Sequence, residues 1–304
     1  MSGRAPAGRP WEIHAALAGA QVGFALFPIL GKLVLAWIPP LPFAALRVAA
    51  AAAVLEVVRR VPAREAIRRA DVPRLVLYGL LGVSFNQILF IMGLSLTSAI
   101  HTTILTATIP VFTVAAAVAL KRERLTIPAI AGIALAAAGA LVLLNAQRMP
   151  WGSPSLSGDL LLLANCTSYS LYLVLSRTLL ARYRVATFTA AVFRYGAVLI
   201  CLVALPGLLR LEPRRIPSSA WASLFGVVVL CTVLPYLLNS WALARTDASR
   251  VAFYVFLQPL MSTILAILVL GEVLTLRVVG ASLLIFAGLA AAMLGGRIRA
   301  RPVP

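Results

Sequence analysis

An internal duplication constrains the fold of this chain more than any other feature of its sequence. When residues 99–145 are laid over 248–294, a shift of 149 positions makes three kinds of residue coincide: Pro110 with Pro259, Glu123 with Glu272, and Gly139 with Gly288. Each glutamate also begins a Glu-x-Leu-Thr motif. Because 62% of the chain is hydrophobic, apolar matches alone would carry little weight. The shared motifs therefore indicate a repeated pair of helices around a short charged turn.

Apolar runs of about 18–22 residues recur along the chain, which is the length that spans the hydrocarbon core of a bilayer. The mean hydropathy is +0.98 and only 12% of residues are charged. A soluble protein of 304 residues would not need so many helices that are apolar on every side. We therefore expect an all-α integral membrane protein with ten spans, near residues 12–35, 40–60, 73–95, 98–120, 126–145, 158–180, 186–209, 218–242, 248–271 and 275–295.

The ten expected spans fall into two halves of five. The longest polar connection, 147–158, is rich in Pro, Gly and Ser, so we expect a first repeat at 12–145, a linker at 146–157 and a second repeat at 158–295. The earlier spans of the two halves also correspond, since Arg47 matches Arg194 at an offset of 147. Five is an odd number, so the second repeat must enter the membrane from the opposite side. The sequence therefore predicts an inverted repeat with a pseudo-two-fold axis in the membrane plane.

The formal net charge of +18 reflects orientation in the membrane better than binding to nucleic acid. Nineteen Lys and Arg residues fall in segments on the side of the termini, against five in the segments on the other side. This bias predicts cytoplasmic N- and C-termini. The three cysteines, Cys166, Cys201 and Cys231, lie inside expected spans, so we expect neither disulfides nor a metal site. The first apolar stretch is too long for a signal-peptide core and is kept as a span.

With ten spans, two inverted halves and Pro-x12-Glu-x-Leu-Thr at 110–126 and 259–275, the chain resembles the drug/metabolite transporter superfamily, EamA-type. Within that superfamily it is similar to the YddG-like exporters of amino acids. The resemblance implies a basket of ten helices around a central cavity, lined mainly by spans 1, 3, 4, 6, 8 and 9, with spans 5 and 10 behind it. The first copy departs from the usual Gly-Glu turn, because Arg122 precedes Glu123.

Polar side chains inside membrane spans are costly and usually face the interior of the bundle. On that ground we expect the substrate cavity to be lined by Gln21, Asn86, Gln87, His101, Thr102, Asn165, Ser168, Tyr169, Tyr172, Tyr236, Asn239, Trp241, Tyr254 and Gln258. Single Ser and Thr residues can instead bond their own helix backbone. The tyrosines could stack on a planar substrate or join helices, and Trp241 could belong to an interfacial belt. His101 could cap the fourth span or contact substrate or a proton.

Prolines and basic residues inside the spans give further expectations. Pro110 and Pro259 would put matched kinks in the fourth and ninth spans, which we interpret as gate hinges. For Arg47, Arg194 and Lys32 we expect snorkelling toward the nearer interface. Apart from Glu56, which is close to a span end, all acidic residues lie at or beyond the ends of the expected spans. We therefore expect no buried carboxylate, and facilitated export or weak coupling through His101 rather than carboxylate-driven antiport.

These observations favour an exporter of small metabolites that works by alternating access. Amino acids, including aromatic ones, are the favoured substrates, because a cavity without fixed charge suits zwitterions. Drug-like cations, purines and nucleotide-related metabolites remain alternatives within the same class. An intramembrane enzyme is not favoured, because no ATP-binding or metal-ligating motif is present, and we expect no catalytic residue, cofactor or metal. A non-transporting assembly factor would not need a polar cavity. We expect a monomer in a bacterial-type plasma membrane, with the bilayer and a small-molecule substrate as partners and no nucleic acid.

Overall fold

The computed structural model describes residues 10–60, 65–121, 127–144, 153–180, 182–243, 254 and 257–295. All regular elements in these ranges are helical, as expected for an all-α protein. They are α1 (Pro10–Leu35), α2 (Pro40–Arg60), η1 (Arg69–Asp71), α3 (Val72–Gly79), η2 (Leu80–Phe85), α4 (Asn86–Leu96), α5 (Ala99–Thr106), α6 (Ile109–Ala119), α7 (Ile127–Leu144), α8 (Pro154–Leu180), α9 (Val185–Leu209), η3 (Pro213–Arg215), α10 (Ser218–Val228), η4 (Val229–Val233), α11 (Leu234–Leu243), α13 (Leu257–Leu270) and α14 (Leu276–Gly295).

The described helices account for the ten expected spans. Seven helical stretches are long and apolar enough to cross a bilayer, and three shorter apolar helices, in α7, α13 and α14, complete the set. The third span consists of α3, η2 and α4, the fourth of α5 and α6, and the eighth of α10, η4 and α11. Of the ninth expected span, residues 248–253, 255 and 256 lie outside the described part of the chain.

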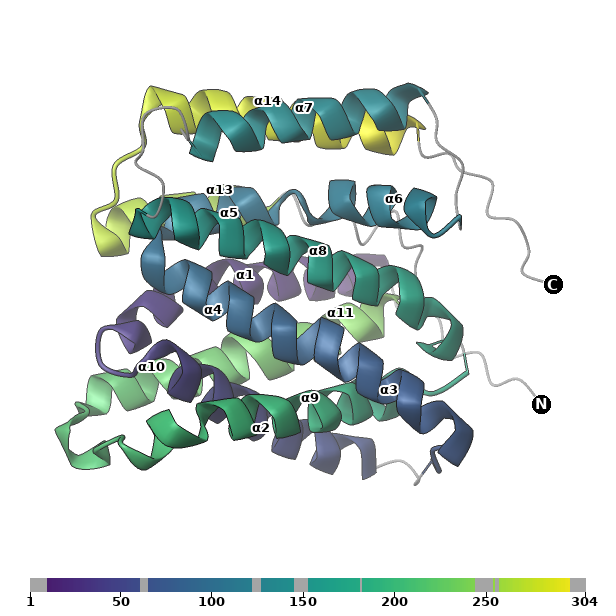
Figure 1. Ribbon diagram of the computed structural model, residues 1–304, viewed down its shortest axis with the longest axis vertical. Helices are drawn as coiled ribbons and strands as arrows, with labels where there is room; N and C mark the ends of the chain where they lie inside the picture. The colour runs from purple at the N-terminus through teal and green to yellow at the C-terminus, as the bar shows by residue number, and fades with distance from the viewer. Residues whose placement is uncertain are drawn as a thin grey trace.

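Helix packing follows the pseudo-two-fold relation between the halves. The fifth and tenth spans, α7 and α14, lie side by side at the top of Figure 1, and the second and seventh, α2 and α9, at the bottom. Between these pairs, α4 packs on α8 while α1 packs on α10 and α11. The first contact joins spans 3 and 6, and the second joins spans 8 and 1. Span 8 is the counterpart of span 3 in the other half, and span 1 is the counterpart of span 6, so the two contacts are equivalent. The packing therefore confirms two five-helix repeats.

A turn of π-helix interrupts the third and the eighth spans at equivalent places. The first begins at Leu80 and the second at Val229, 149 residues later. A π-turn shifts the backbone hydrogen bonds and releases carbonyl groups to other partners. Ser168 of α8 donates to the Leu81 carbonyl over 2.8 Å, and Thr232 donates to the Val227 carbonyl over 2.8 Å. The two π-turns thus aim polar groups at the centre of the bundle.

The matched prolines lie near the starts of helices. Pro110 is the second residue of α6, after a break at Ala107 and Thr108 that separates it from α5. The break confirms an interruption of the fourth span, because proline lacks the N–H that would continue the helical bonds. Pro259 is the third residue of α13, and the chain just before α13 falls outside the described residues, so a matching break there stays a prediction.

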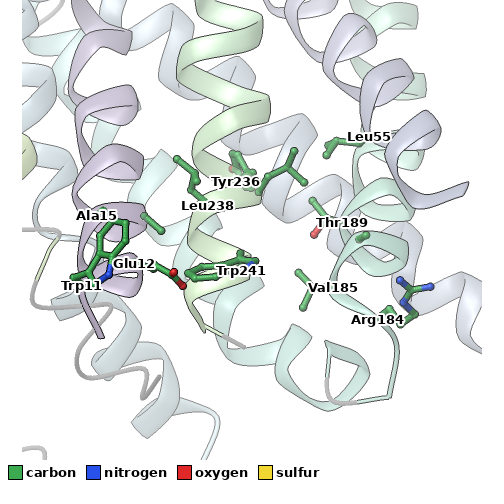
Figure 2. Close-up of a pocket in the computed structure, with 13 residues that line it drawn as sticks. Trp11, Glu12, Ala15, Leu55, Arg184, Val185, Thr189, Tyr236, Leu238 and Trp241 are labelled. Atoms are coloured by element: carbon green, nitrogen blue, oxygen red, sulfur yellow. The ribbon is translucent and has the colours of Figure 1, made fainter. Parts of the chain in front are cut away.

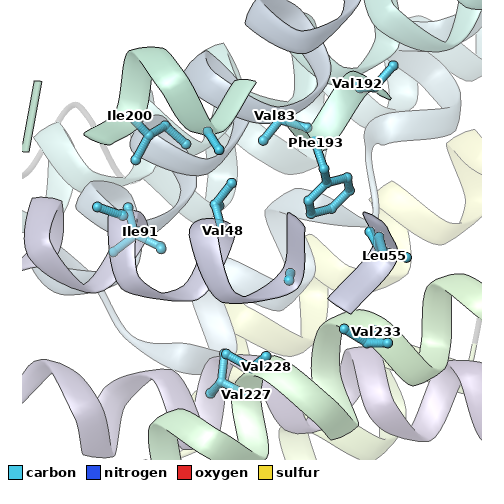
Figure 3. Close-up of a cluster of buried hydrophobic side chains, with 14 of the residues drawn as sticks. Val48, Leu55, Val83, Ile91, Val192, Phe193, Ile200, Val227, Val228 and Val233 are labelled. Atoms are coloured by element: carbon cyan, nitrogen blue, oxygen red, sulfur yellow. The ribbon is translucent and has the colours of Figure 1, made fainter. Parts of the chain in front are cut away.

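The apolar core is divided into two main clusters. The larger joins α1 to α4 with α9, α10 and their neighbours, and Figure 3 shows Val48, Val83 and Phe193 converging within it. The second joins α5, α7, α8, α13 and α14. Large apolar side chains such as Leu202 and Leu268 remain exposed on the outside of the bundle. Such surfaces suit contact with lipid tails rather than water.

Candidate functional site

An open cavity of about 810 Å³ lies between the beginnings of α1 and α9, the far part of α2, and α11. Its lining residues are Trp11, Glu12, Ala15, Ala16, Leu55, Arg184, Val185, Ala186, Thr189, Tyr236, Leu237, Leu238 and Trp241. Figure 2 shows Trp11 and Glu12 of α1 facing Trp241, with Arg184 and Thr189 on the far side. A volume of this size can hold a metabolite. We call this end of the bundle, where α1 begins, the open end.

Tyr236 connects the cavity to the centre of the bundle. It lines the cavity and also lies close enough to Tyr169 and Arg47 for its hydroxyl to interact with both. The rings of Phe24 and Phe193 meet its ring edge-on, with centroids 5.7 Å and 5.3 Å away. This geometry holds the phenol in place between the cavity and the polar groups behind it.

Those polar groups form what we call the central cluster: Arg47, Asn86, Gln87, Asn165, Tyr169, Tyr172, Thr232 and Tyr236. Arg47 is only 2% exposed. Its Nε donates to Thr232 Oγ1 over 2.9 Å, its Nη1 donates to Gln87 Oε1, and its guanidinium carbon lies 3.8 Å from the centre of the Phe27 ring. The expectation that Arg47 snorkels to an interface is therefore wrong.

The correction for Arg47 has a physical reason. Thr232, Gln87 and the Phe27 ring contact its guanidinium group in the middle of the bundle and hold the side chain there, away from the headgroups. Arg194, its counterpart in the repeat, is only half-buried and donates to the adjacent Tyr195 hydroxyl over 3.3 Å. The duplicated arginines therefore lie in different environments, and the centre of the bundle carries a positive charge that was not expected from the sequence.

Asn86 and Gln87 of the third span and Asn165 of the sixth span hold the cluster together. The Gln87 amide donates to Asn86 Oδ1 over 3.0 Å, and the Asn165 amide donates to the Asn86 carbonyl over 2.7 Å. Gln87 therefore uses its carbonyl for Arg47 and its amide for Asn86. Since all three side chains are buried and linked, they fix the orientation of the Arg47 guanidinium group.

Two further tyrosines of α8 complete the cluster. The rings of Tyr169 and Tyr172 lie 5.6 Å apart, and both residues are half-buried. Tyr172 sits against Gly82 of the π-turn, where a Cβ would come within 2.6 Å of its ring. Gly82 thus makes room for an aromatic side chain beside the polar centre.

The other candidate residues lie outside the central cluster. Gln258 of α13 donates to Gln21 of α1, which joins these two helices. Tyr254 lies 2.5 Å from His14 Nδ1 through its hydroxyl. Thr102 donates to the carbonyl of Ser98 in its own helical turn over 2.9 Å. The side chain of Asn239 lies outside the described part of the structure.

The opposite end, which we call the sealed end, is tied by polar contacts. Lys32 donates to the Thr97 carbonyl, joining α1 to the turn before α5. The Glu272 carboxylate accepts from the backbone N–H groups of Ala99 and Ile100 over 2.7 and 2.9 Å. Negative charge is favourable at a helix N-terminus, so Glu272 fastens the α13–α14 turn to α5.

A buried carboxylate also lies at the sealed end. Asp159 is fully buried, and its Oδ2 lies 3.0 Å from His101 Nδ1. The expectation of no buried carboxylate is therefore wrong. The reason is that α8 begins at Pro154 rather than at 158, which makes Asp159 the sixth residue of the helix instead of one at its edge.

Several cavity residues were not among the sequence-based candidates. Trp11, Glu12 and Arg184 lie at span ends, and Leu55 is apolar, so polarity in the middle of a span does not mark them. Thr189 is polar but lies only four residues into the expected seventh span. The cavity wall also differs from the one implied by the resemblance, because spans 1, 2, 7 and 8 surround the opening. The central cluster draws on spans 2, 3, 6 and 8.

Ten spans in two inverted repeats, with a polar centre reached through an open cavity, define a membrane transporter by architecture. The sequence model of the EamA-like transporter family matches residues 11–145 and 156–294. The chain belongs to this family, which is part of the drug/metabolite transporter superfamily. It is therefore a multi-pass membrane transporter and not an enzyme.

Curated relatives agree with this assignment. The chain is 24% identical to the uncharacterized transporter YyaM of Bacillus subtilis over 280 residues, which are 89% of this chain and 91% of YyaM. It is 29% identical to YdfC, an uncharacterized transporter of the same organism, over 68% of this chain and 66% of YdfC. An uncharacterized transporter of Archaeoglobus fulgidus is 29% identical over 47% of this chain and 50% of its own length. The chain thus spans half to two thirds of the last two relatives.

A protein of known crystal structure shares the fold. It superposes with a TM-score of 0.64 at 22% sequence identity, over 95% of this chain and 100% of that protein. At this level of identity the similarity concerns the fold alone.

Proposed function

We propose that this chain exports small metabolites that carry a carboxylate, with amino acids, including aromatic ones, as its substrates. The observation that carries this proposal is Arg47, a buried cation beside a cavity-lining tyrosine. A cavity without fixed charge was expected, whereas the charge of Arg47 favours the same substrate class through its carboxylate.

An unpaired buried charge is expensive. Among the described residues, no carboxylate lies within ion-pair distance of Arg47, which is held instead by neutral Thr232 and Gln87 and by the Phe27 ring. A substrate carboxylate would supply the missing counter-charge, and a guanidinium group can bind it through two hydrogen bonds. A drug-like cation would be repelled by the same group, so the cluster disfavours that alternative.

Aromatic side chains around Arg47 suit the remainder of such a substrate. Tyr169, Tyr172 and Tyr236 belong to the central cluster, and the rings of Phe24 and Phe193 pack on Tyr236. Aromatic rings pack favourably on one another in edge-on or offset arrangements. The hydroxyl groups of the tyrosines would meet the polar backbone of an amino acid, while their rings meet an aromatic side chain.

The two ends of the bundle support alternating access. One end holds the open cavity, and the other is tied by Lys32, Glu272 and the His101–Asp159 pair. With the termini in the cytoplasm, the open end faces inward, which is the loading state of an exporter. We further propose that the protein acts as a monomer in a bacterial-type plasma membrane, and that Pro110 and Pro259 serve as hinges between the two states.

Counterflow in liposomes tests this function. Purified protein is reconstituted with an internal pool of unlabelled phenylalanine, and accumulation of labelled phenylalanine, tryptophan, leucine and adenine is followed. We expect saturable exchange of the amino acids and its loss in Arg47→Gln. Arg194→Gln is the matched control, because this arginine occupies the equivalent position of the other repeat and lies outside the central cluster. Exchange of adenine without exchange of amino acids would overturn the substrate assignment.

A further inference from the structure

The His101–Asp159 pair lies between two helices whose separation would open the sealed end. His101 is the third residue of α5, and Asp159 is the sixth residue of α8. His101 Nδ1 lies 3.0 Å from Asp159 Oδ2, whereas Asp159 Oδ1 is buried without a hydrogen-bond partner among the described residues. The pair is therefore a direct polar bridge between the two repeats, with one orphaned carboxylate oxygen.

The charge of this pair depends on how many protons it holds. With one proton, neutral histidine faces an aspartate anion, and the pair carries a net negative charge in a buried site. With two protons, the pair is an imidazolium–carboxylate ion pair or a neutral acid beside a neutral base, and its net charge is zero. Burial of net charge is costly, so sealing this end favours the second state.

Few other charged groups lie on the elements packed against α5 and α8. From α1 comes Lys32, which lies close enough to Glu272 of the α13–α14 turn for their charges to attract. Glu272 itself accepts from the N-terminal N–H groups of α5. Arg277 lies at the start of α14, and η2, α4, α6 and α13 contribute no charged side chain. On the other two elements packed against α8, Arg74 of α3 and Arg194 of α9 lie toward the open end. Lys32 and Glu272 therefore largely balance each other, and neither forms an ion pair with Asp159.

From this geometry we propose that His101 and Asp159 form a proton-binding site whose occupancy stabilises closure of the sealed end. The inference rests on the alternating-access function proposed above and adds proton control to it. When the end opens, water reaches the pair, and the penalty for its net negative charge falls. Closing therefore takes up a proton, and acid on this side of the membrane favours the closed state.

A proton suits this site better than a sodium ion. Alkali and alkaline-earth cations need several oxygen ligands, whereas Asp159 Oδ1 is the one buried side-chain atom without a partner in the described part of the structure. Histidine, in contrast, changes its charge within the physiological pH range. No group of three or more His, Cys, Asp or Glu side chains that could hold a metal occurs among the described residues.

Spin-label distances measure closure without any need for transport. Trp37→Cys in the α1–α2 turn and Leu274→Cys in the α13–α14 turn place labels on two exposed positions at this end, in protein held in nanodiscs. Between pH 8.5 and pH 5.5 we expect the short-distance population to rise, by at most about tenfold per pH unit for a single linked proton. Asp159→Asn should stay closed at both pH values, and His101→Gln should lose the pH response.

Two control variants separate this site from its neighbours. His14→Gln replaces the other histidine of the chain, which lies toward the open end. Glu272→Gln weakens the tie between the α13–α14 turn and α5, so it should lower the closed population at both pH values. In both variants the closed population should still change with pH. Wild-type distances that do not change with pH would overturn the proposal, as would loss of the response in either control variant, or a response to sodium at constant pH. The spin-label experiment contains no substrate, so its outcome does not depend on whether the protein exchanges amino acids in liposomes.

Discussion

Gly139 of α7 and Gly288 of α14 make the same contact with each other's helix from opposite sides. A Cβ on Gly139 would lie 2.7 Å from Ile285 Cγ1, and a Cβ on Gly288 would lie 2.6 Å from the Ala136 nitrogen. Gly288 follows Gly139 by 149 residues, and Ile285 follows Ala136 by the same number. The pseudo-two-fold axis therefore runs between these helices, and the sequence repeat is also a symmetry of contacts.

This symmetry predicts equal effects of equivalent substitutions. Gly139→Leu and Gly288→Leu should each lower the free energy of unfolding by about 1–3 kcal/mol, because a side chain at either place forces α7 and α14 apart. Gly280→Ala on α14 should change it by less than about 0.5 kcal/mol, since a Cβ there meets nothing. Denaturant unfolding in detergent checks all three. A large effect at only one of the matched glycines would contradict the symmetric packing.

Tyr236 should contribute to selectivity for aromatic substrates. Tyr236→Ala removes the ring between the cavity and Arg47, so we expect phenylalanine to bind about 2- to 10-fold more weakly, from a loss of about 0.5–1.5 kcal/mol. Alanine or serine as ligand should lose less. Tyr236→Phe keeps the ring and should preserve binding of phenylalanine, as isothermal titration would show. Equal losses for all three ligands in Tyr236→Ala would exclude a ring contact.

Pro110 should affect the rate of transport more than the affinity. Pro110→Ala restores a backbone N–H just after the break between α5 and α6, which would favour one continuous helix. If this break is a hinge, the maximal rate of exchange falls while the equilibrium affinity for substrate stays within about twofold. Exchange and binding measured on the same preparation separate the two quantities. An unchanged rate in folded Pro110→Ala protein would remove the hinge.

Glu272 should hold the sealed end shut. Glu272→Ala leaves the Ala99 and Ile100 N–H groups without their acceptor, and loss of such a helix cap costs about 0.5–2 kcal/mol. We expect the open population of this end to grow, and a membrane-impermeant thiol reagent to modify a cysteine placed at Ser155 faster. A labelling rate equal to that of the otherwise unchanged protein would show that Glu272 does not contribute to closure.

Much of the fold follows from the sequence, because span length and the repeated Pro, Glu and Gly positions depend on local physics. The ten spans and the correspondence between the two halves could be predicted in this way. The two π-turns could not, since no residue type at Leu80 or Val229 marks them. The carbonyl groups that they release bind side chains of other helices, such as Ser168, and this contact is visible only in the structure.

The site was less accessible to prediction, for a related reason. An arginine inside an apolar run can snorkel or be buried, and the choice for Arg47 depends on Gln87 and Thr232, which are distant in the chain. Asp159 was expected at the edge of a span because residues 154–157, which form the start of α8, were assigned to the linker. The polar candidates of the third, sixth and eighth spans could be predicted because a polar side chain inside a membrane span costs free energy. The residues at the cavity mouth lie near span ends and carry no such cost, so the sequence does not mark them.

The most direct test of the central claim compares phenylalanine with phenethylamine, which differs from it only by the missing carboxylate. Titration of the wild-type protein should give saturable binding of phenylalanine and binding of phenethylamine at least about tenfold weaker, since a charge-assisted hydrogen bond to Arg47 contributes about 1.5–3 kcal/mol. Arg47→Gln should remove the preference and Arg194→Gln should keep it. Equal or tighter binding of phenethylamine by the wild-type protein would contradict a carboxylate site at Arg47.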